Sequence, residues 1–488
     1  MSGAVQPVHF DKQHALHDVA ATRQLEQQAH RALPPHTLMS RAGLAVARLA
    51  LALAPHARCI WIAAGPGNNG GDGLEAAMHL QRWGKHPVVS WLGSAETATE
   101  DTRASYLNAV GAGVAFADAP PATYDLCIDA LLGIGSQTRE PAGRMADWMV
   151  HINHQGAPVL AVDVPSGLQA DTGSTSVLRV KASHTLSLLT LKPGLFTAHG
   201  RDVTGSVWLD DLQHGQADAA ALAPTAWLAG HMTTASRTHA SHKGSYGDVV
   251  VVGGAKGMTG AALLAGSAAL HGGAGRVFVS LLDGQPMSLD PSLPELMFRS
   301  FETLDLDHMS VVCGCGGGTD IAAILPRLLQ SAAKLALDAD ALNVIAQSTP
   351  LQTLLCARGE QQRSTILTPH PLEAARLLAC RTSEVQANRL ERAQQLAQRF
   401  ACTVVLKGSG TVITQADHTP VINPTGNAKL ATGGTGDVLA GLIGARLAAG
   451  LNGFDAACQA VYQHGLVADL WPPDQALTAS HLAKALTA

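Results

Sequence analysis

Apolar and polar residues follow two periods along the chain, one typical of buried strands and one of amphipathic helices. In the first half, helical spacing predicts helices over residues 22–32 and 38–53, with Thr22 as a cap and Pro34-Pro35 as the break between them. Another helix is predicted over residues 74–83. Short apolar runs predict strands over residues 59–64, 87–91, 124–128, 159–162 and 185–191. Strands that alternate with helices indicate an α/β protein with mostly parallel sheets.

The second half repeats the pattern of strand, glycine-rich or polar turn, and helix. Its predicted helices cover residues 261–271 and 438–447. Its predicted strands cover residues 248–252, 276–281, 311–313, 334–337, 365–367 and 402–406. Between the halves, residues 210–243 lack a clear period and are rich in Ala, Thr, His, Ser and Gly. This change predicts a boundary near residues 213–235, and we expect domains over residues 1–222 and 223–488.

Polar residues stand where the predicted strands of the first half end. The run GPGNNGGDG follows the strand at residues 59–64 and precedes a helix, which is the phosphate-binding arrangement of doubly wound folds. The acidic residue that a dinucleotide site carries about 20 positions later is missing, which disfavours an NAD-dependent dehydrogenase. Asp129, Asp163 and Ser166 follow later strands. Each of them alone is explained by a turn or a cap, but together with Asn69 they predict a ligand site at one edge of the sheet.

The second half also carries candidate groups at its strand ends. These groups are Asp338, Asp340, His370 and Lys407. Taken singly, the two aspartates are explained as helix caps, His370 as an exposed turn residue and Lys407 as a solvated strand end. Their recurrence at the ends of successive strands predicts ligand groups along one rim of a parallel sheet.

The stretch NPTGNAKLATGGTGDVLAG, residues 423–441, places four glycines before a predicted helix. Glycines let a backbone approach a ligand closely, and a helix start offers free N–H groups and a positive dipole, which suits phosphate. Asp437 would repel phosphate unless it handles a proton or a metal ion. The stretch therefore predicts a phosphate cradle with an acid/base group beside it. The alternative interpretation is an ordinary capped helix.

Composition excludes several classes of protein. Of the 488 residues, 47% are hydrophobic and 15% are charged, and the net charge is −5, so no electrostatic footprint for nucleic acid is present. No apolar run is long enough to cross a bilayer and the first residues lack a signal-peptide pattern, which favours a cytoplasmic enzyme with no membrane partner. Most of the eight cysteines are interpreted as reduced core residues. Cys313 and Cys315 form a CxC, whose spacing alone does not predict a zinc site.

The motifs GPGNNGGDG, IDALLGIG, AVDVPSG and LKPGL, in this order, resemble the NAD(P)H-hydrate epimerase domain over about residues 8–212. The resemblance implies a Rossmann-like three-layer α/β/α fold, a potassium ion held by Asn69, Asp129 and Ser166, and Asp163 as the acid/base group. Oxygen ligands of these types suit a hard cation. The resemblance also implies substrate contacts from two loops: Asn68, Asn69, Gly70, Gly71, Asp72, Gly133, Ile134, Gly135, Ser136, Gln137, Thr138 and Arg139.

The motifs GxGGG, DADAL, TPHPxE, KGSGT and GGTGDVLAG, from about residue 243 onwards, resemble the ADP/ATP-dependent NAD(P)H-hydrate dehydratase of the ribokinase-like superfamily. The resemblance implies Asp437 as the catalytic base and a magnesium ion that accompanies the nucleotide. It implies substrate contacts from Ala261, Gly316 and His370. Nucleotide contacts are implied for Lys407, Gly408, Ser409, Gly410, Thr411, Gly433, Gly434 and Gly436. Two positions depart from the usual family pattern, Leu372 where Gly is usual and Cys315 where Pro is usual, and both affect loop shape.

Together the two resemblances imply a bifunctional enzyme that repairs hydrated NADH or NADPH. The first domain would interconvert the R and S hydrates, and the second would dehydrate the S hydrate with ADP or ATP, giving NAD(P)H, phosphate and AMP or ADP. The expected partners are small molecules, and self-association as a homo-oligomer is compatible with the resemblance. Two alternatives stay open: a ribokinase-like small-molecule kinase, and a first domain that serves as a binding or scaffold module without catalysis.

Overall fold

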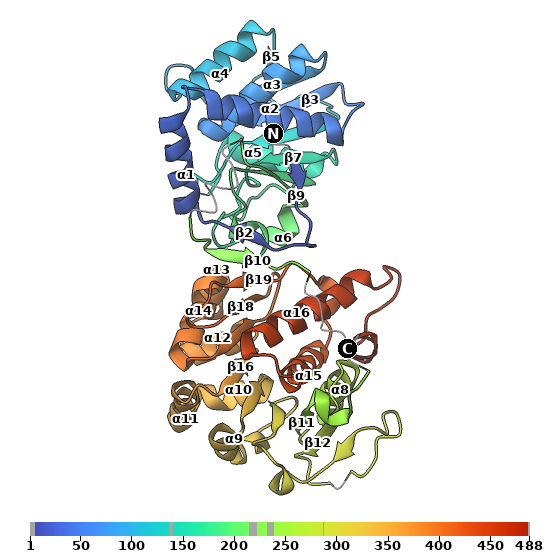
Figure 1. Ribbon diagram of the computed structural model, residues 1–488. Helices are drawn as coiled ribbons and strands as arrows, with labels where there is room; N and C mark the ends of the chain where they lie inside the picture. The colour runs from blue at the N-terminus through green and yellow to red at the C-terminus, as the bar shows by residue number, and fades with distance from the viewer. Residues whose placement is uncertain (1–4, 136–139, 214–221, 232–238, 286, 487–488) are drawn as a thin grey trace. The chain divides into compact units, whose positions relative to one another are not determined.

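The computed structural model describes residues 5–135, 140–213, 222–231, 239–285 and 287–486. The chain divides into two compact units (Figure 1), one of Met1–Phe10 and His14–Trp227 and the other of Asp11–Gln13 and Leu228–Ala488. The short segment Asp11–Gln13 thus belongs to the second unit, although the residues on either side of it belong to the first. The predicted boundary between residues 222 and 223 stays a prediction.

The first unit is built on one sheet with the strand order β1-β9-β8-β7-β6-β3-β4-β5. Neighbouring strands from β9 to β5 are parallel, and β1 pairs with β9 antiparallel. The strands are β1 (Gln6–Pro7), β3 (Cys59–Ala64), β4 (His86–Trp91), β5 (Ala115–Phe116), β6 (Leu126–Ala130), β7 (Val159–Val162), β8 (His184–Leu188) and β9 (Ser206–Asp210). The helices are α1 (Val19–Ala32), α2 (Thr37–Leu53), α3 (Asn68–Arg82), α4 (Glu100–Gly111), α5 (Arg144–His154) and α6 (Gly200–Val203).

Strand β3 shows why this unit has three layers. Its side chains alternate between the two faces of the sheet, as in any strand. Ile60 and Ile62 belong to a buried cluster with residues of α2 and α3, whereas Trp61 belongs to another with Trp148 and Met149 of α5. Because both faces are buried, the strand is a continuous apolar run. The prediction of a three-layer α/β/α unit is confirmed.

Two local predictions in this unit are wrong. Helix α3 begins at Asn68 and not near residue 74, because the glycines of the NNGGDG run form its first turns. A Cβ at Gly70 would lie 2.0 Å from the carbonyl oxygen of Gly65, so tight packing selects glycine there despite its poor helix propensity. Helix α1 is capped by Asp18, whose side chain accepts a hydrogen bond from the Ala21 N–H, and Thr22 is buried inside the helix.

The second unit holds a larger sheet, whose strands within this unit follow the order β13-β12-β11-β14-β15-β16-β17-β18-β19. Neighbours from β13 to β17 are parallel, and β18 and β19 are antiparallel additions. The strands are β11 (Asp248–Gly253), β12 (Arg276–Leu281), β13 (Met297–Phe298), β14 (Met309–Cys313), β15 (Lys334–Leu337), β16 (Ser364–Leu367), β17 (Thr403–Leu406), β18 (Val412–Thr414) and β19 (Val421–Ile422). Two further short strands, β2 (His14–Leu16) and β10 (Ala226–Leu228), lie next to the division of the chain.

Helices cover both faces of this sheet. Figure 1 shows α8, α15 and α16 on one side and α10, α11, α12 and α14 on the other. The helices are α8 (Thr259–His271), α9 (Leu325–Ser331), α10 (Ala339–Ala346), α11 (Thr349–Glu360), α12 (Pro371–Leu378), α13 (Thr382–Ala387), α14 (Arg389–Phe400), α15 (Thr435–Ala448), α16 (Gly453–Leu470) and α17 (Ala479–Ala485). The predicted α/β class is therefore confirmed in this unit as well.

The close packing of α15 places its first turn against the carboxyl edge of the sheet. A Cβ at Gly441 would lie 2.0 Å from the Ala265 carbonyl oxygen of α8, and one at Gly444 would lie 2.4 Å from Val312 Cγ2 of β14. Glycine at both positions lets the helix approach its neighbours, which fixes where the helix begins.

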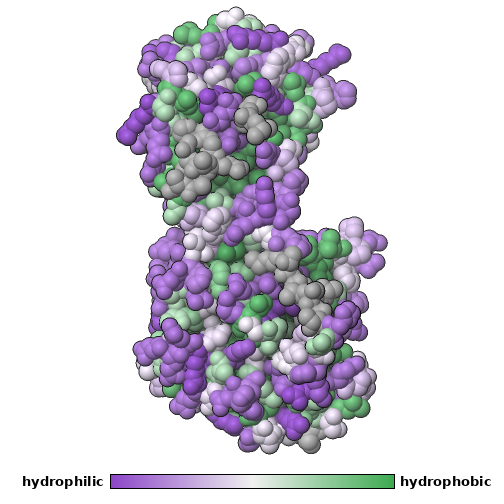
Figure 2. Space-filling view, in the orientation of Figure 1, coloured by the Kyte–Doolittle hydropathy of each residue, from purple (hydrophilic) through white to green (hydrophobic). Residues whose placement is uncertain are grey.

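The surface is mainly polar. Figure 2 shows hydrophilic residues over most of the visible face, with hydrophobic residues in small separate patches. Among the described residues, none of the helices has the length and apolar character needed to span a bilayer. All eight cysteines carry free thiols.

Candidate active sites

A pocket of about 460 Å³ opens at the carboxyl edge of the first sheet, beyond the ends of β3, β6 and β7. Ligands bind at this edge in open α/β sheets. Seven of the predicted site residues line the pocket: Asn68, Asn69, Asp72, Gly133, Ile134, Gly135 and Asp163. Gly70 and Gly71 instead allow α3 to pack closely on Gly65 and Met39. Ser136, Gln137, Thr138 and Arg139 lie outside the described residues.

Asp129 and Ser166 form one buried unit beneath the pocket. The Ser166 hydroxyl donates to Asp129 Oδ1 at 2.6 Å, and the Ser166 N–H donates to Oδ2 at 2.8 Å. Burial raises the pKa of Asp129 to about 6, although these hydrogen bonds act in the opposite direction. The Nδ2 atom of Asn69 is buried and has no hydrogen-bond partner among the described residues. A carboxylate, a hydroxyl and an amide left partly unsatisfied fit a hard monovalent cation.

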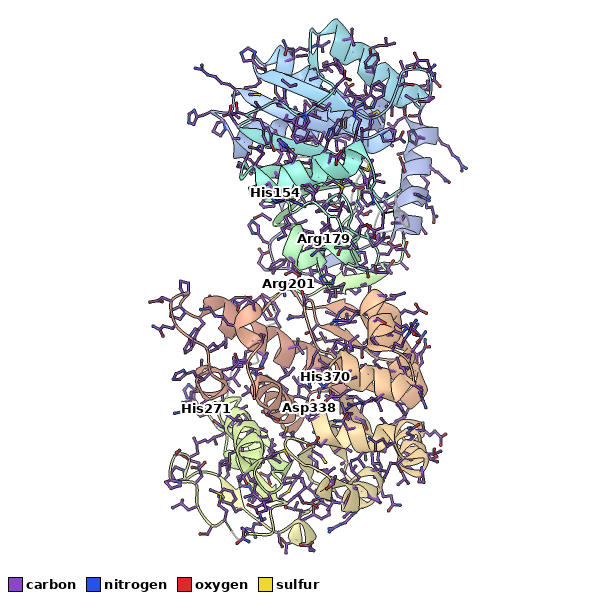
Figure 3. The ribbon with its side chains drawn as sticks, turned by 180° about the vertical axis from the view of Figure 1, so that it is seen from behind. His154, Arg179, Arg201, His271, Asp338 and His370 are labelled. Atoms are coloured by element: carbon purple, nitrogen blue, oxygen red, sulfur yellow. The ribbon has the colours of Figure 1, made fainter. Side chains whose placement is uncertain are left out.

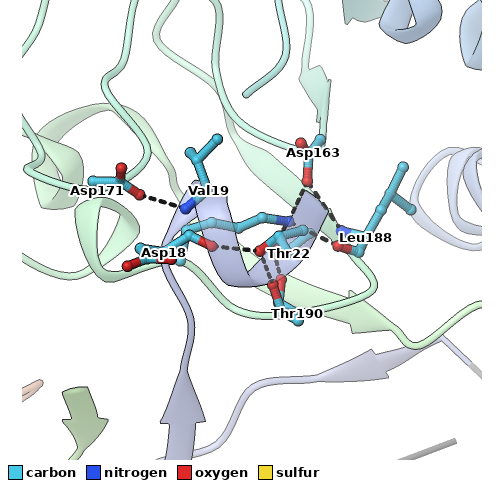
Figure 4. A network of polar contacts seen from close by, with 9 residues as sticks. Asp18, Val19, Thr22, Asp163, Asp171, Leu188 and Thr190 are labelled. Atoms are coloured by element: carbon cyan, nitrogen blue, oxygen red, sulfur yellow. Dashed lines mark hydrogen bonds and ion pairs between the residues drawn. The ribbon is translucent and has the colours of Figure 1, made fainter. Parts of the chain in front are cut away.

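Asp163 is held in an unusual backbone conformation by a buried ion pair. Its φ is 66°, in the left-handed region that few residues other than glycine adopt. Lys192 Nζ donates to Asp163 Oδ1 at 2.5 Å, and the Leu188 N–H donates to the same oxygen at 3.3 Å. Figure 4 shows these contacts beside the pair of hydroxyls of Thr22 and Thr190, which lie 2.7 Å apart. Strained residues that the surroundings hold in place are characteristic of active sites.

A second carboxyl group, that of Asp72, lines the same pocket. Burial, followed by the negative charges of Asp163 and Glu26, raises the pKa of Asp72 well above its ordinary value. The pocket thus holds one carboxyl group paired with a lysine, Asp163, and one whose pKa is raised by burial, Asp72, and such unlike environments suit acid/base chemistry.

In the second unit, Asp437 lies in the first turn of α15 within a cluster of polar groups. One ligand atom each from Cys315, Asp338 and Asp437 lie within 4.8 Å of one another. Lys407 Nζ donates to Asp338 Oδ1 at 2.6 Å, and the Thr368 hydroxyl donates to it at 2.8 Å. Asp338 directly follows β15 and His370 follows the neighbouring strand β16, so both stand at the same edge of the sheet (Figure 3).

Asp437 has the electrostatics of a general base. Burial, and then the charge of Asp338, raise the pKa of Asp437 to about 6, while the Cys315 hydrogen bond and Lys407 act in the opposite direction. A base whose pKa lies near working pH is deprotonated at neutral pH and still able to accept a proton. The Cys315 thiol is fully buried and its pKa lies well above the ordinary value, mainly because of burial.

The reaction at Asp437 should therefore depend on pH with an acidic limb near pH 6. Below this pH the carboxyl group holds its proton and cannot accept another, so we expect kcat to fall about tenfold per pH unit. Initial rates with saturating nucleotide and hydrate between pH 4.5 and 8 test this, with circular dichroism at each pH to check that the chain stays folded. A flat profile from pH 5 to pH 7 contradicts the assignment of Asp437 as base.

The KGSGT turn is held from beneath by a residue that the sequence did not single out. Arg389 of α14 is 1% exposed, and its Nη2 donates to the carbonyl oxygens of Leu406 and Lys407 at 3.0 and 3.1 Å. A Cβ at Gly408, whose φ is 133°, would lie 3.0 Å from Arg389 Nη1. Burial lowers the pKa of Arg389 to about 10, so the guanidinium remains charged at neutral pH. Arg389 therefore fixes the strand end that carries Lys407.

Replacing Arg389 by Met should loosen this turn. Two buried carbonyl groups lose their donors, which costs roughly 1–3 kcal/mol each. We expect a lower melting temperature and a several-fold higher KM for the nucleotide, with a smaller effect on kcat. Arg392→Met on the same helix is the matched control, because within the described residues its side chain donates to the Gln395 side chain and not to the KGSGT turn. If both variants have equal nucleotide KM values, Arg389 does not position the turn.

The remaining predicted residues of the second unit occupy turns around this edge. His370 caps α12, where Nδ1 accepts from the Leu372 and Glu373 N–H groups, and its Nε2 lies 3.1 Å from Glu373 Oε1. Gly316, with a φ of 58°, packs against Ala261, and Gly434, with a φ of 91°, immediately precedes α15. Gly433 and Gly436 flank the start of α15, and Ser409, Gly410 and Thr411 complete the KGSGT turn. At Gly436 a Cβ would lie 3.5 Å from Lys407 Nζ, so this turn faces the lysine.

Both departures from the usual family pattern lie at this edge. Leu372 is exposed on the first turn of α12, and its backbone N–H donates to Nδ1 of the capping residue His370. Cys315 contacts Asp437, so this departure touches the proposed base and is more than a change of loop shape.

Two family models match the chain. One is described as "NAD(P)H-hydrate dehydratase" and matches residues 249–488, and the other is described as "YjeF-related protein N-terminus" and matches residues 35–194. The curated bifunctional NAD(P)H-hydrate repair enzyme Nnr of Escherichia coli (strain K12) is 36% identical over 461 residues, covering 89% of this chain and 85% of that protein. The chain belongs to the bifunctional NAD(P)H-hydrate repair enzymes. The resemblance found in the motifs is thereby confirmed.

A second repair enzyme and one solved structure are also similar to this chain. The repair enzyme Nnr of Coxiella burnetii is 33% identical, covering 92% of this chain and 93% of that protein. The structure of an ADP/ATP-dependent NAD(P)H-hydrate dehydratase from Bacillus subtilis, co-crystallised with ATP and Mg²⁺, is 32% identical with a TM-score of 0.44, covering 52% of this chain and 92% of that chain. Both proposed acid/base residues, Asp163 and Asp437, lie within the stretches that the family models match.

Proposed function

We propose that this repair enzyme epimerises hydrated NADH and NADPH in its first domain, residues 1–222, and dehydrates the S hydrate in its second, residues 223–488. The observation that carries the proposal is the presence, at the carboxyl edge of each sheet, of one positioned carboxylate: Asp163 beside Lys192, and Asp437 beside Asp338 and Lys407. Two separate acid/base sites in one chain match a reaction that needs two chemical steps.

In the second domain, Asp437 would accept the proton of the substrate hydroxyl as that oxygen attacks the terminal phosphoryl group of ADP or ATP. The first turn of α15, with Gly433, Gly434 and Gly436, offers N–H groups to the phosphates, and Lys407 offsets their charge. This attack breaks the bond between the terminal phosphorus and its bridging oxygen, which releases AMP or ADP. Phosphate then leaves with the electrons of the C–O bond, and loss of a proton from the adjacent ring carbon restores the C=C bond of the dihydronicotinamide. Magnesium, bound with the nucleotide, would neutralise phosphate charge, and the carboxylates of Asp338 and Asp437 fit such an ion.

In the first domain, Asp163 would take the proton of the added hydroxyl, so that the C–O group becomes a carbonyl as the neighbouring ring C–N bond breaks. Re-closure on the other face, with return of the proton, would invert the hydroxyl-bearing carbon. Asn68, Asn69, Asp72 and residues 133–135 would hold the hydrate in the pocket. A potassium ion held by Asn69, Asp129 and Ser166 would supply positive charge at the pocket floor.

Epimerisation should therefore depend on potassium. We expect the rate to fall at least about tenfold when potassium is replaced by choline at constant ionic strength, because the ligands would then lose a specific charge partner. Asp129→Asn should epimerise at the same low rate in potassium and in choline. Asp125 is an exposed acidic residue before β6, so the epimerisation rate of Asp125→Asn should fall on removal of potassium as the native rate does. Equal rates of the native chain in the two salts contradict the potassium site.

The decisive experiment uses a mixture of R and S NADH hydrates with the full chain, ADP and magnesium, and follows the return of NADH absorbance. Complete recovery that requires nucleotide supports both activities. Recovery of one epimer alone contradicts the epimerase and favours a first domain that only binds. A phosphorylated product that accumulates without NADH favours the small-molecule kinase alternative. Cytoplasmic location and self-association remain predictions, which fractionation and light scattering test.

A further inference from the structure

Lys192 is the only fully buried lysine in contact with a proposed acid/base residue among the described residues. Its side chain is 0% exposed. Its ammonium donates to Asp163 Oδ1 at 2.5 Å, to the Leu188 carbonyl oxygen at 2.7 Å and to Ser187 Oγ at 3.3 Å. An ammonium group has three N–H donors, so these three contacts use all of them.

The same contacts orient the Asp163 carboxylate. Oδ1 receives both the Lys192 ammonium and the Leu188 N–H, which lies at 3.3 Å (Figure 4). Within the described part of the chain, Oδ2 accepts no hydrogen bond, and Asp163 lines the pocket. The left-handed backbone at Asp163, with φ of 66°, persists because these contacts hold it. One oxygen is thus anchored, and the other remains available to a molecule in the pocket.

Charged side chains surround the Asp163–Lys192 pair on both sides. On the pocket side, Asp72 of α3, Glu26 of α1 and Asp101 of α4 are acidic, and Arg23 of α1 is basic. On the lysine side stand His17, Asp18 and Asp171. Acidic side chains thus line the pocket near Asp163, and Lys192 is the basic group in direct contact with its carboxylate. A buried carboxylate that loses such a partner binds its proton more tightly.

We propose that Lys192 is the positioning residue of the epimerase site, pairing with Asp163 and anchoring Oδ1 so that Oδ2 exchanges the proton with the substrate. The inference rests on the proposed epimerase function of the first domain. Lys192 keeps its own protons throughout, since its three donors are already engaged. The proton that Oδ2 accepts is returned within the same turnover, so no net proton is gained or lost.

The test measures epimerisation of separated R hydrate by the full chain between pH 5 and 9, and uses S-hydrate dehydration by the same sample to normalise enzyme concentration. Lys192→Met should lower kcat at pH 7 by about 10–100-fold and move the acidic limb of the profile upward by about 1–3 pH units, with partial recovery at high pH. Lys192→Arg restores the charge and should return the limb towards its native position. KM should change less than kcat.

Other outcomes overturn the proposal. A purely structural lysine would lower the melting temperature and leave the shape of the pH profile unchanged. If Lys192→Met reduces the rate by the same factor in an Asp163→Asn background as in the native chain, Lys192 acts independently of Asp163. Should Lys192→Met fail to fold, Lys192→Gln, which keeps donors but no charge, carries the same prediction for the acidic limb.

Measuring epimer interconversion by the native chain distinguishes a failure of the Lys192 proposal from a failure of the proposed epimerase function. If the native chain does not interconvert the epimers, the epimerase proposal fails and the role of Lys192 fails with it. If the native chain does so and Lys192→Met retains the native pH profile, only the role of Lys192 is overturned.

Discussion

Replacing Asp437 by Asn is expected to lower the dehydratase kcat by roughly 10²–10⁴-fold, the range over which a positioned general base contributes. The amide keeps the volume of the side chain but cannot accept the proton of the substrate hydroxyl. Asp437 lies at the start of α15, where the helix dipole and the glycines prepare a place for phosphate, so binding should survive the change. The loss should therefore appear in kcat, with nucleotide KM changed by less than about tenfold.

Two comparisons make this result specific. Asp340→Asn is the matched control, because that carboxylate anchors the Gly318 N–H at 2.8 Å and is not proposed to take a proton. Its loss should cost less than about tenfold, the value of an ordinary hydrogen bond. R-to-S epimerisation by the Asp437→Asn chain, followed without nucleotide, should keep its native rate. A variant that still dehydrates the S hydrate at the native rate removes Asp437 from the mechanism.

Replacing Asp163 by Asn should divide the repair of a mixed hydrate into two phases. The S hydrate should be repaired at the native rate, because the second domain is unaltered. The R hydrate should follow much more slowly, since epimerisation is expected to fall by roughly 10²–10⁴-fold relative to the native chain. The amplitude of the fast phase, measured by NADH absorbance, then equals the S fraction of the mixture.

Asp171→Asn provides the comparison for Asp163. This carboxylate is also close to Lys192, but its Oδ1 accepts from the Val19 N–H and it does not line the pocket. It should leave both phases within about tenfold of their native rates, as expected for the loss of one hydrogen bond. Complete single-phase repair by Asp163→Asn would assign epimerisation to another residue.

Much of the fold follows from short-range pattern. Strands such as β3, β7 and β15 are apolar runs bounded by turns, and their residue types alone indicate them. The candidate acids Asp129, Asp163 and Asp437 were found because each stands at a strand end or a helix start, where the topology of a parallel sheet gathers ligands. The start of α3 could not be found this way, because its glycines are poor helix formers until the neighbouring backbone requires them.

The residues that support the acids were missed for a different reason. Lys192 stands in the quoted LKPGL motif, but its contact with Asp163 joins positions separated by 29 residues and leaves no local signal. Arg389 begins an amphipathic helix in which arginines are expected to face solvent, yet it is buried beneath the KGSGT turn. Cys315 belongs to the CxC pair and departs from the family pattern, but only the fold places its thiol beside Asp437. Long-range partners of this kind require coordinates.

The assignment of Asp11–Gln13 to the second unit has a practical consequence for anyone who wishes to study the two halves as isolated proteins. Gly230 shows how closely this segment is fitted, since a Cβ there would lie 2.2 Å from the Lys12 carbonyl carbon. A single genetic cut near residue 222 would leave these residues on the wrong fragment. A fragment of the second unit that lacks Asp11–Gln13 could lose activity because it folds poorly, and this loss would be mistaken for the loss of a catalytic residue. Mixing the two fragments and measuring whether activity returns is therefore the safer assay.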